Sequence, residues 1–445
     1  MINSFIKRKI FYKSPKFLKK ILLIIPTKYK IGFSSFNNEL KKINESSRII
    51  DEFSLEEYYV SQINEVLKIA KGYQFYQDLY KENGITNFKI NSLEEFERFP
   101  IISKNQIRNS NYIDEVKRKN INLYPANTGG SSGKPFRFFL PSDIYSKIWN
   151  YKILAWNKLG YDLGDSVLSF RGHNFNELFQ HQTIYNFYYV DSYKLNKENV
   201  FELIKLIKKK KIKYLHGYPS NLLNFAFLIE NFKIEFPISG IFTASEMINF
   251  PDKTRLEFIF NSKVLSTFEQ SESTIFAHRD NFKEGYKFSP SYGYPELKNR
   301  KLIATSFVNT VMPLIKYDTG DLCNELIFED KFIRTNEIVG RESEILKINN
   351  KFISITGIIY GQHLPIFEYS ISIQVYVNNN SFYLIICSHS TIPEESIIKT
   401  KSILDKIIAP ELKSEVLITD KSLKTKAGKL KILISKEDFL QIHNS

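Results

Sequence analysis

The stretch best suited to chemistry is Tyr124–Pro135, which reads Tyr-Pro-Ala-Asn-Thr-Gly-Gly-Ser-Ser-Gly-Lys-Pro. A backbone freed of Cβ atoms can turn successive N–H groups inward, and hydroxyls and an ammonium add further donors for an anion of high charge. This pattern predicts a phosphate-binding loop. The residues expected to contact phosphate are Thr128, Gly129, Gly130, Ser131, Ser132, Gly133 and Lys134.

Two other interpretations of this stretch stand beside the first. Runs of Gly, Ser and Thr are most often ordinary surface loops. The P-loop of NTPases, G-x-x-x-x-G-K-[ST], needs a glycine where Thr128 stands and a hydroxyl where Pro135 stands. Both positions fail, so this chain lacks the Mg²⁺-binding hydroxyl of that motif.

The elements around the loop alternate between strands and helices. This order predicts an α/β fold with a parallel sheet, whose ligands gather at the carboxyl ends of the strands. The expected strands are Ser166–Phe170, Ile212–His216, Gly240–Ala244 and Val264–Phe268, and the expected helices are one that begins at Ser92, Ser142–Leu159, Lys197–Lys209, Pro219–Asn231 and Pro251–Phe260. Ser142 is expected to cap the second of these helices and Gly160 to follow its last residue.

Polar residues follow the expected strands where a ligand would bind. Ser245 and Glu246 come after one strand, and Ser271 and Glu272 after the next. Each glutamate alone is more often a solvated loop residue. Two carboxylates at one edge of a sheet make a metal or polar site more credible.

The chain is expected to form two domains. Residues 1–340 form the large one, with a basic helical arm and helices in 1–90 and an antiparallel β-unit in 286–340, where strands are expected at Lys301–Phe307, Pro313–Tyr317, Leu326–Phe328 and Lys331–Thr335. Residues 341–445 form a small, mobile α+β domain, with strands Ile345–Ile348 and Glu415–Ile418, a hairpin Ser372–Cys387 and a helix Pro393–Ile408.

Composition restricts the classes of function. The 445 residues are 43% hydrophobic and carry a net charge of +14, but the lysines are scattered and no nucleic-acid-binding motif occurs, so nucleic acid is not expected as a partner. Two distant cysteines give no disulfide framework and favour the cytoplasm. The N-terminus has no acidic residue before Glu39, and a basic arm of this kind either packs on its own domain or lies on an anionic membrane surface.

Taken together, the motifs resemble those of the adenylate-forming (AMP-binding) superfamily, in the branch of phenylacetate–coenzyme A ligases and their CapK-like capsular polysaccharide biosynthesis relatives. The resemblance covers about Ser92 to Lys431, with the motifs in the expected order. It is carried by Thr128–Pro135, Ala244-Ser245-Glu246, Phe268-Glu-Gln-Ser-Glu272, Pro313-Leu-Ile-Lys-Tyr-Asp-Thr-Gly-Asp321, Gly340-Arg341 and Gly428-Lys429.

The resemblance implies a role for each motif. The glycine-rich loop holds the β- and γ-phosphates of ATP, Phe268 stacks on adenine, and Glu272 helps to hold Mg²⁺. Asp321 binds both ribose hydroxyls, and Arg341 precedes the hinge between the domains. Lys429 is the lysine that promotes adenylation. Ser245, Glu246, Glu269 and Ser271 complete the expected nucleotide contacts.

This chain also departs from the family pattern. Glu269 replaces a glycine near adenine and Asp318 replaces an arginine, so the pocket is more acidic than usual. Ser343 stands where the family has an aspartate or lysine, and Asn350 where it has a glycine lining the thiol channel. These two departures bear on the second half-reaction, the transfer of the acyl group.

The resemblance implies an ATP-dependent acid ligase that forms an acyl-adenylate and transfers the acyl group to coenzyme A. An amine or a hydroxyl of a saccharide is the alternative acceptor. A different class, a non-catalytic nucleotide-binding or basic surface-binding protein, is the alternative. The residues expected to contact the acid are Arg171, His173, His216 and Tyr218, which lie near strand ends.

Overall fold

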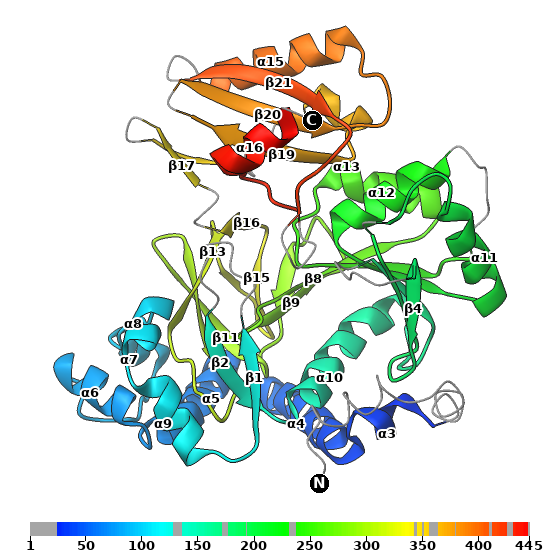
Figure 1. Cartoon of the computed structure of the whole chain (residues 1–445). Coiled ribbons are helices and arrows are strands. Elements are labelled where there is room, and N and C mark those ends of the chain that lie inside the picture. Colours follow the sequence, from blue (N-terminus) through cyan, green and yellow to red (C-terminus); the bar gives the residue numbers. More distant parts are fainter. Residues whose placement is uncertain are drawn as a thin grey trace. The chain divides into compact units, whose positions relative to one another are not determined.

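The computed structural model describes residues 25–127, 136–170, 177–192, 194–230, 237–341, 345–348, 351–355, 364–378, 380–408, 412–424 and 430–443 (Figure 1). The described residues divide into two compact units that interleave along the chain. Unit 1 takes the chain up to Ser166, His181–Phe187 and Leu265–Ile338; unit 2 takes Val167–Gln180, Tyr188–Val264 and the residues from Val339 onward. The domain boundary expected at residue 341 and the mobility of the second domain stay predictions.

Unit 1 begins with helices whose apolar faces are buried. In α5, a Ser54 side chain accepts from Glu57 N and starts the helix, and the apolar residues at helical spacing, Tyr59 and Ile63 among them, are fully buried. Ser92 caps α7 in the same way, as expected. The helices are α3 Thr27–Ile31, α4 Phe33–Glu52, α5 Leu55–Ala70, α6 Gln74–Glu82, α7 Leu93–Glu97, α8 Lys104–Asn109, α9 Tyr112–Lys119 and α10 Ile144–Trp156.

The start of α10 corrects one expectation. Asp143, and not Ser142, is the residue at the N-cap position, and its side chain makes no capping hydrogen bond. The end is as expected: the helix passes into a short 3₁₀ turn, and Gly160 follows in the left-handed conformation with φ of 78°.

The strands of unit 1 form antiparallel arrays. One runs in the order β14, β15, β10, β9, β8, and another in the order β11, β12, β13. Their bounds are β8 Val264–Glu269, β9 Phe276–Arg279, β10 Tyr286–Phe288, β11 Gly293–Lys298, β12 Lys301–Ser306, β13 Tyr317–Cys323, β14 Ile327–Phe328 and β15 Ile333–Thr335; β1 Leu123–Asn127 pairs with β2 Arg137–Pro141.

The strand expected at Pro313–Tyr317 is wrong, because the extended segment starts where that strand was expected to end. Lys316 has a φ of 46°, which breaks an extended run just before β13. The main-chain oxygen of Lys316 accepts from Ile102 N at 2.9 Å, and Asp318 N donates to Ile102 O at 2.8 Å. These bonds hold the start of β13 beside the segment that leads to α8.

Unit 2 contains the parallel strands that the sequence predicts. β3 Val167–Phe170, β6 Tyr214–Gly217 and β7 Gly240–Ala244 are parallel neighbours, and every residue in them is buried. The helices that follow them are α11 Val200–Lys210, α12 Pro219–Ile229 and α13 Phe250–Phe260. The α/β fold class is confirmed. A further pair of strands, β4 Phe179–Gln182 and β5 Phe187–Val190, was not expected.

Gly217 ends β6 at a point of close backbone approach. A Cβ atom there would lie 2.4 Å from Phe170 O, so a side chain does not fit without a shift of backbone. The same carbonyl accepts from Tyr218 N at 3.1 Å and from Asn221 Nδ2 at 3.2 Å. The end of β3 thereby fixes where α12 begins.

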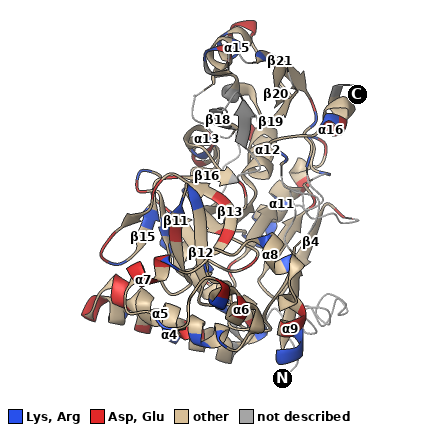
Figure 2. Ribbon diagram, turned by 90° about the vertical axis from the view of Figure 1, so that its left-hand side faces the viewer, with Lys and Arg blue, Asp and Glu red and all other residues tan. Residues whose placement is uncertain are grey.

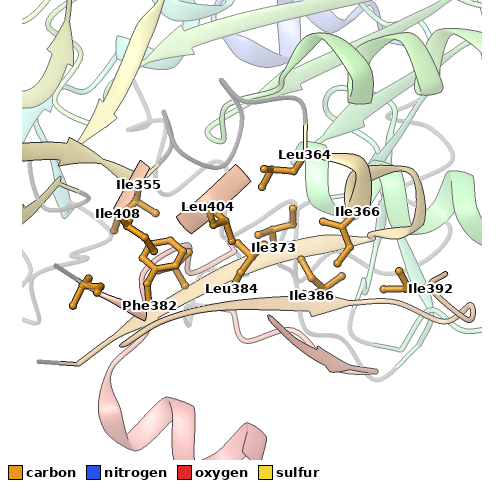
Figure 3. Close-up of a cluster of buried hydrophobic side chains, with 12 residues drawn as sticks. Ile355, Leu364, Ile366, Ile373, Phe382, Leu384, Ile386, Ile392, Leu404 and Ile408 are labelled. Carbon is orange, nitrogen blue, oxygen red and sulfur yellow. The ribbon is translucent and has the colours of Figure 1, made fainter. Parts of the chain in front are cut away.

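The C-terminal part of unit 2 has two apolar faces on one small sheet. The strands and helices of this part are β16 Ile338–Arg341, β17 Ile345–Ile348, β18 Lys351–Ser354, β19 Ser372–Val377, β20 Ser381–Cys387, β21 Lys413–Thr419, α15 Glu394–Ile408 and α16 Lys436–His443. Alternate residues Phe382, Leu384 and Ile386 of β20 join Leu404 of α15 in one cluster (Figure 3), and Ile385 joins Phe439 of α16 in another.

Both cysteines are free, buried thiols. Cys323 Sγ donates to Glu325 O at 2.8 Å, and burial raises the pKa of this thiol. Burial raises the pKa of Cys387 to about 11, against a smaller lowering by Ser372.

Surface charge of both signs is spread along the chain. Figure 2 shows Lys and Arg interspersed with Asp and Glu on the elements in view, in keeping with scattered rather than clustered lysines. Among the described helices, none combines the length and the apolar character that crossing a bilayer requires. The basic arm expected at the N-terminus lies outside the described residues as far as position 24.

Candidate active site

Glu272 is a buried carboxylate held by two donors in unit 1. Tyr317 Oη donates to Glu272 Oε1 at 2.7 Å, and Lys104 Nζ lies 3.3 Å from the same oxygen. The residue is 4% exposed, so these donors replace the water that a buried charge loses. Burial, and then the neighbouring negative charge of Glu272, raise the pKa of Tyr317 well above its ordinary value, so the phenol stays a donor.

Asp321 is a second buried carboxylate in unit 1 and is 6% exposed. Gln270 Nε2 donates to its Oδ2 at 3.1 Å, and Thr274 Oγ1 in turn donates to Gln270 Oε1. Asp321 N donates to Thr319 Oγ1 at 3.1 Å. Gln270, itself held by Thr274, thus positions Oδ2 of the carboxylate, while the bond to Thr319 holds the main chain of Asp321.

The two carboxylates are held by the same pair of segments. β13 supplies Tyr317 and Asp321, and the segment after β8 supplies Gln270 and Glu272. One bond crosses between these segments in each direction, from Tyr317 to Glu272 and from Gln270 to Asp321. The structure therefore brings together two acidic residues that the sequence predicts to share a nucleotide site.

The acidic departures from the family pattern are paired with lysines. Glu269 Oε1 lies 2.7 Å from Lys152 Nζ, and Asp318 Oδ2 lies 3.4 Å from Lys301 Nζ. The extra charges are therefore compensated within unit 1, and the excess of acid that the sequence suggested is smaller than expected.

Phe268 and Ser271 flank these carboxylates in the chain. Phe268 is half-buried near the end of β8, with its ring centroid 6.4 Å from that of Tyr286. Ser271 is exposed. A half-exposed ring can offer a face to a planar base, and the predicted adenine contact stays a prediction.

Glu246, in unit 2, has both oxygens bonded to backbone amides. Ser220 N, in the first turn of α12, donates to Oε2 at 3.1 Å, and Leu430 N donates to Oε1 at 2.8 Å. An acidic side chain at a helix N-terminus is favoured by the helix dipole. Leu430 directly follows Lys429, so Glu246 is bonded to the segment that carries the expected adenylation lysine. Its neighbour Ser245 is exposed and has a φ of 70°.

A second contact joins the same parts of unit 2. Lys424 Nζ donates to Asn221 Oδ1, and Asn221, 1% exposed, also donates to Phe170 O at the end of β3. Burial lowers the pKa of Lys424, and the negative charge of Glu246 partly offsets this lowering.

The residues expected to contact the acid are only partly described. His216 is 5% exposed, and its Nδ1 lies 2.9 Å from Ser169 Oγ; Tyr218 is buried at the N-cap position of α12. These are packed positions at the carboxyl ends of parallel strands. Arg171 and His173 lie outside the described residues.

Several predicted nucleotide contacts also fall outside the described residues. These are Thr128, Gly129, Gly130, Ser131, Ser132, Gly133, Lys134 and Lys429. Arg341 is the last residue of β16. Their roles stay predictions, as do those of the hinge positions Ser343 and Asn350, which are likewise not described.

A magnesium ion fits this site with help from a substrate. Within the described part of the chain, no group of three His, Cys, Asp or Glu residues is arranged to hold a metal. Mg²⁺ is commonly held by one or two carboxylates together with substrate phosphates, however. Glu272 can serve as such a carboxylate. Tyr317 and Lys104 both contact its Oε1, which leaves Oε2 to face a cation.

Sequence reasoning missed the residues that hold the carboxylates. Lys104 belongs to no motif and follows Ser103, which caps α8. Tyr317 and Gln270 lie inside quoted motifs, and an alternating pattern beginning at Tyr317 was the available signal for β13. Asn221 and Lys424 carry no signal, since their contact joins segments about two hundred residues apart.

The chain is similar in sequence to one curated protein and in fold to several solved structures. Protein CapK of Staphylococcus aureus is 26% identical over 338 residues, covering 71% of this chain and 73% of CapK. No family model matches the chain. A 2-hydroxyisobutyryl-CoA ligase in complex with R3-HIB-AMP aligns with a TM-score of 0.67 and 15% identity, covering 88% of this chain and 92% of that one. The anthranilate CoA ligase AuaEII, in complex with anthranoyl-AMP, aligns with a TM-score of 0.50 and 12% identity over 76% and 74% of the two chains.

Proposed function

We propose that this chain, which has the fold of acyl-adenylate-forming CoA ligases and is similar in sequence to CapK, is an ATP-dependent acid ligase. It activates a carboxylic acid as an acyl-adenylate and passes the acyl group to coenzyme A. The observation that carries this proposal is the pair of buried carboxylates Glu272 and Asp321. Glu272 accepts a hydrogen bond from Tyr317, and Asp321 accepts one from Gln270.

The first half-reaction determines which groups the protein must supply. A carboxylate oxygen of the acid attacks the α-phosphorus of ATP, the bond to the bridging oxygen breaks, and pyrophosphate leaves with the electron pair. Negative charge builds up on phosphate oxygens, so fixed donors and cations must face them. In the second half-reaction a thiol sulfur attacks the acyl carbon, AMP leaves, and the thiol proton passes to solvent.

The described residues support the nucleotide-binding part of this scheme. Asp321 is held in one orientation and is suited to accept from two ribose hydroxyls. Glu272 keeps one oxygen for a cation while Tyr317 and Lys104 hold the other. A bound Mg²⁺ would neutralise phosphate charge and polarise the phosphoryl oxygens. Lys429 is assigned to the carboxylate and the α-phosphate, on the strength of the resemblance.

Pyrophosphate exchange tests the first half-reaction directly. The full chain is incubated with ATP, Mg²⁺, labelled pyrophosphate and one member of a panel of aromatic, fatty, amino and sugar acids. We expect label to enter ATP only in the presence of a suitable acid. ATP binding by calorimetry, with no exchange for any acid, would favour a nucleotide-binding protein without turnover.

A chase experiment tests the acceptor. The acyl-adenylate is formed, separated from ATP, and challenged with coenzyme A, with an amine, or with a hydroxylated saccharide. Coenzyme A is expected to discharge the adenylate with release of one AMP per thioester. Discharge by the amine or the saccharide alone would transfer the assignment to those acceptors.

A further inference from the structure

A pocket of about 790 Å³ with both polar and apolar walls lies within unit 2, and none of the residues assigned above to ATP lines it. Its walls come from the segment before α11, from one face of α12, and from the C-terminal segments at the ends of β19, β20 and β21. Ser220, Asn224 and Leu228 follow one another at intervals of four, so they form a single stripe of α12. The size suits a small organic molecule.

The hydroxyls of Ser192 and Ser220 line this pocket and have no hydrogen-bond partner among the described residues; a third hydroxyl of the lining, that of Ser372, lies beside the Cys387 thiol. Ser192 and Ser220 are 6% and 8% exposed. A buried polar group left unpaired is unfavourable. The two hydroxyls come from separate segments and line one pocket. A ligand with polar substituents would supply the hydrogen-bond partners that they lack.

The mouth of the pocket carries an excess of positive charge. Lys197 and Lys421 are exposed there and make no ion pair within the described part of the chain, and Lys424 reaches the same space. Glu198 and Asp420 balance two of these three lysines. A ligand with a negative charge is therefore favoured over a neutral or cationic one.

Apolar surface alternates with the polar groups. Leu195, Leu228 and Ile371 line the pocket and are buried. Side chains of this kind contact C–H groups, while the serines require hydroxyl or carboxyl partners. A compact carbon skeleton that carries several hydroxyls and one negative charge meets all three demands.

Ser220 also connects this pocket with the lysine-bearing segment. Its side chain lines the pocket, while its backbone amide donates to Glu246, whose other oxygen accepts from Leu430 N. We propose that the pocket holds the body of the acid substrate, and that this acid is a sugar acid or a comparably hydroxylated carboxylic acid. This assignment rests on the proposed function, because it names the acid that the ligase activates.

Calorimetric titration of the full chain without ATP tests the pocket apart from turnover. D-glucuronate, cyclohexanecarboxylate and glucose 6-phosphate are compared at the same pH and ionic strength. D-glucuronate is expected to bind at least about tenfold more tightly than cyclohexanecarboxylate, because two or more hydroxyl hydrogen bonds are lost with the latter. Equal or tighter binding of cyclohexanecarboxylate or of glucose 6-phosphate would overturn the assignment.

Matched variants locate the binding. Ser192→Ala, Ser220→Ala and Lys421→Gln are each expected to weaken D-glucuronate binding by roughly threefold to tenfold. Ser262→Ala removes another partnerless hydroxyl outside the pocket, and Lys209→Gln removes an exposed charge on α11; both should leave binding unchanged. Because the two pocket serines are unpaired, their alanine variants should melt no lower than the parent chain. Binding that survives all three pocket variants would show that the pocket is not the site.

The two failures are separable. If pyrophosphate exchange proceeds with other acids while D-glucuronate neither binds nor reacts, the ligase proposal stands and the hydroxylated-acid assignment is wrong. If D-glucuronate binds and the pocket variants weaken it, but no acid supports exchange, the pocket assignment as a binding site stands and the ligase proposal fails.

Discussion

The phenol of Tyr317 donates to Glu272 Oε1 across 2.7 Å, and both groups are buried in unit 1. Replacement of Tyr317 by Phe removes this donor and leaves Lys104 as the partner of the buried carboxylate among the described residues. We expect the free energy of unfolding to fall by about 1–3 kcal/mol, measured by urea denaturation. Tyr80→Phe is the control, because the Tyr80 hydroxyl is buried without a partner among the described residues, and its loss should be neutral or slightly stabilising. Equal effects of the two variants would contradict a special role for the pair.

Asp321→Asn should weaken nucleotide binding more than any neighbouring change. The variant removes the charge that would accept from the ribose hydroxyls, and charge-assisted bonds contribute about 1.5–3 kcal/mol each. The KM for ATP in pyrophosphate exchange is therefore expected to rise at least about tenfold. Asp318→Asn, on the same strand and paired with Lys301 rather than Gln270, should change that KM by less than about threefold. A larger effect at Asp318 would argue against the assignment of Asp321.

Lys429→Ala is expected to lower the adenylation rate by on the order of 10²–10³, as loss of a positioned donor does at other oxyanion sites. Pyrophosphate exchange measures that step, and transfer from a preformed adenylate measures the other. Lys436→Ala, an exposed lysine in the same part of the chain, should have no effect on either. Near-parental exchange by the Lys429 variant would remove this residue from the mechanism.

Glu246→Gln should slow adenylation by about tenfold while leaving the KM for ATP less affected. The amide has one acceptor oxygen, whereas the carboxylate accepts from both Ser220 N and Leu430 N. One of these charge-assisted bonds is lost, and the segment after Lys429 is held less firmly. Glu202→Gln, an exposed acid of α11, serves as the control for charge. An effect confined to the KM would indicate nucleotide contact instead of positioning.

His278 should make the protein less stable in mild acid. Burial, aided by the charges of Lys158 and Lys287 and opposed by Asp280, lowers the pKa of His278 to about 4. The unfolded chain then binds more protons between about pH 6.5 and pH 4, so this residue's contribution is full above pH 6.5 and is lost as pH falls towards 4. The loss amounts to at most about 3 kcal/mol. Urea denaturation across that range should show a shallower pH dependence for His278→Gln; parallel curves would exclude the effect.

Much of the α/β arrangement was predictable because its signals are local. β7 begins and ends at the predicted residues, and Ser92 and Gly160 lie at the helix ends where the sequence puts them. The carboxylate positions Glu272 and Asp321 were also predictable, because each lies in a motif of recognisable spacing. Strand ends and helix caps are decided by neighbouring residues, which a sequence displays directly.

The contacts that hold the site depend on tertiary structure and gave little sequence signal. Lys104 reaches Glu272 from a helix far away in the chain, and Lys152 neutralises Glu269. The strand at Pro313–Tyr317 was misplaced because Lys316 has a positive φ, which its residue type does not signal, and because the pairing of Lys316 O and Asp318 N with Ile102 is a long-range contact. Glu246 was expected among the nucleotide contacts, which stays a prediction, and the bonds that its two oxygens accept from amides in other segments had no sequence signal.

The two buried thiols restrict how an activated acyl group can leave the protein. Cys323 and Cys387 are the only cysteines in the sequence, and with pKa values raised by burial, to about 11 for Cys387, almost none of either is thiolate at neutral pH. Cys387 lines the pocket proposed for the acid, but a thiol that stays protonated is a poor nucleophile towards an acyl-adenylate. Self-acylation is thus suppressed, and any thioester product must carry a sulfur that arrived with a separate molecule.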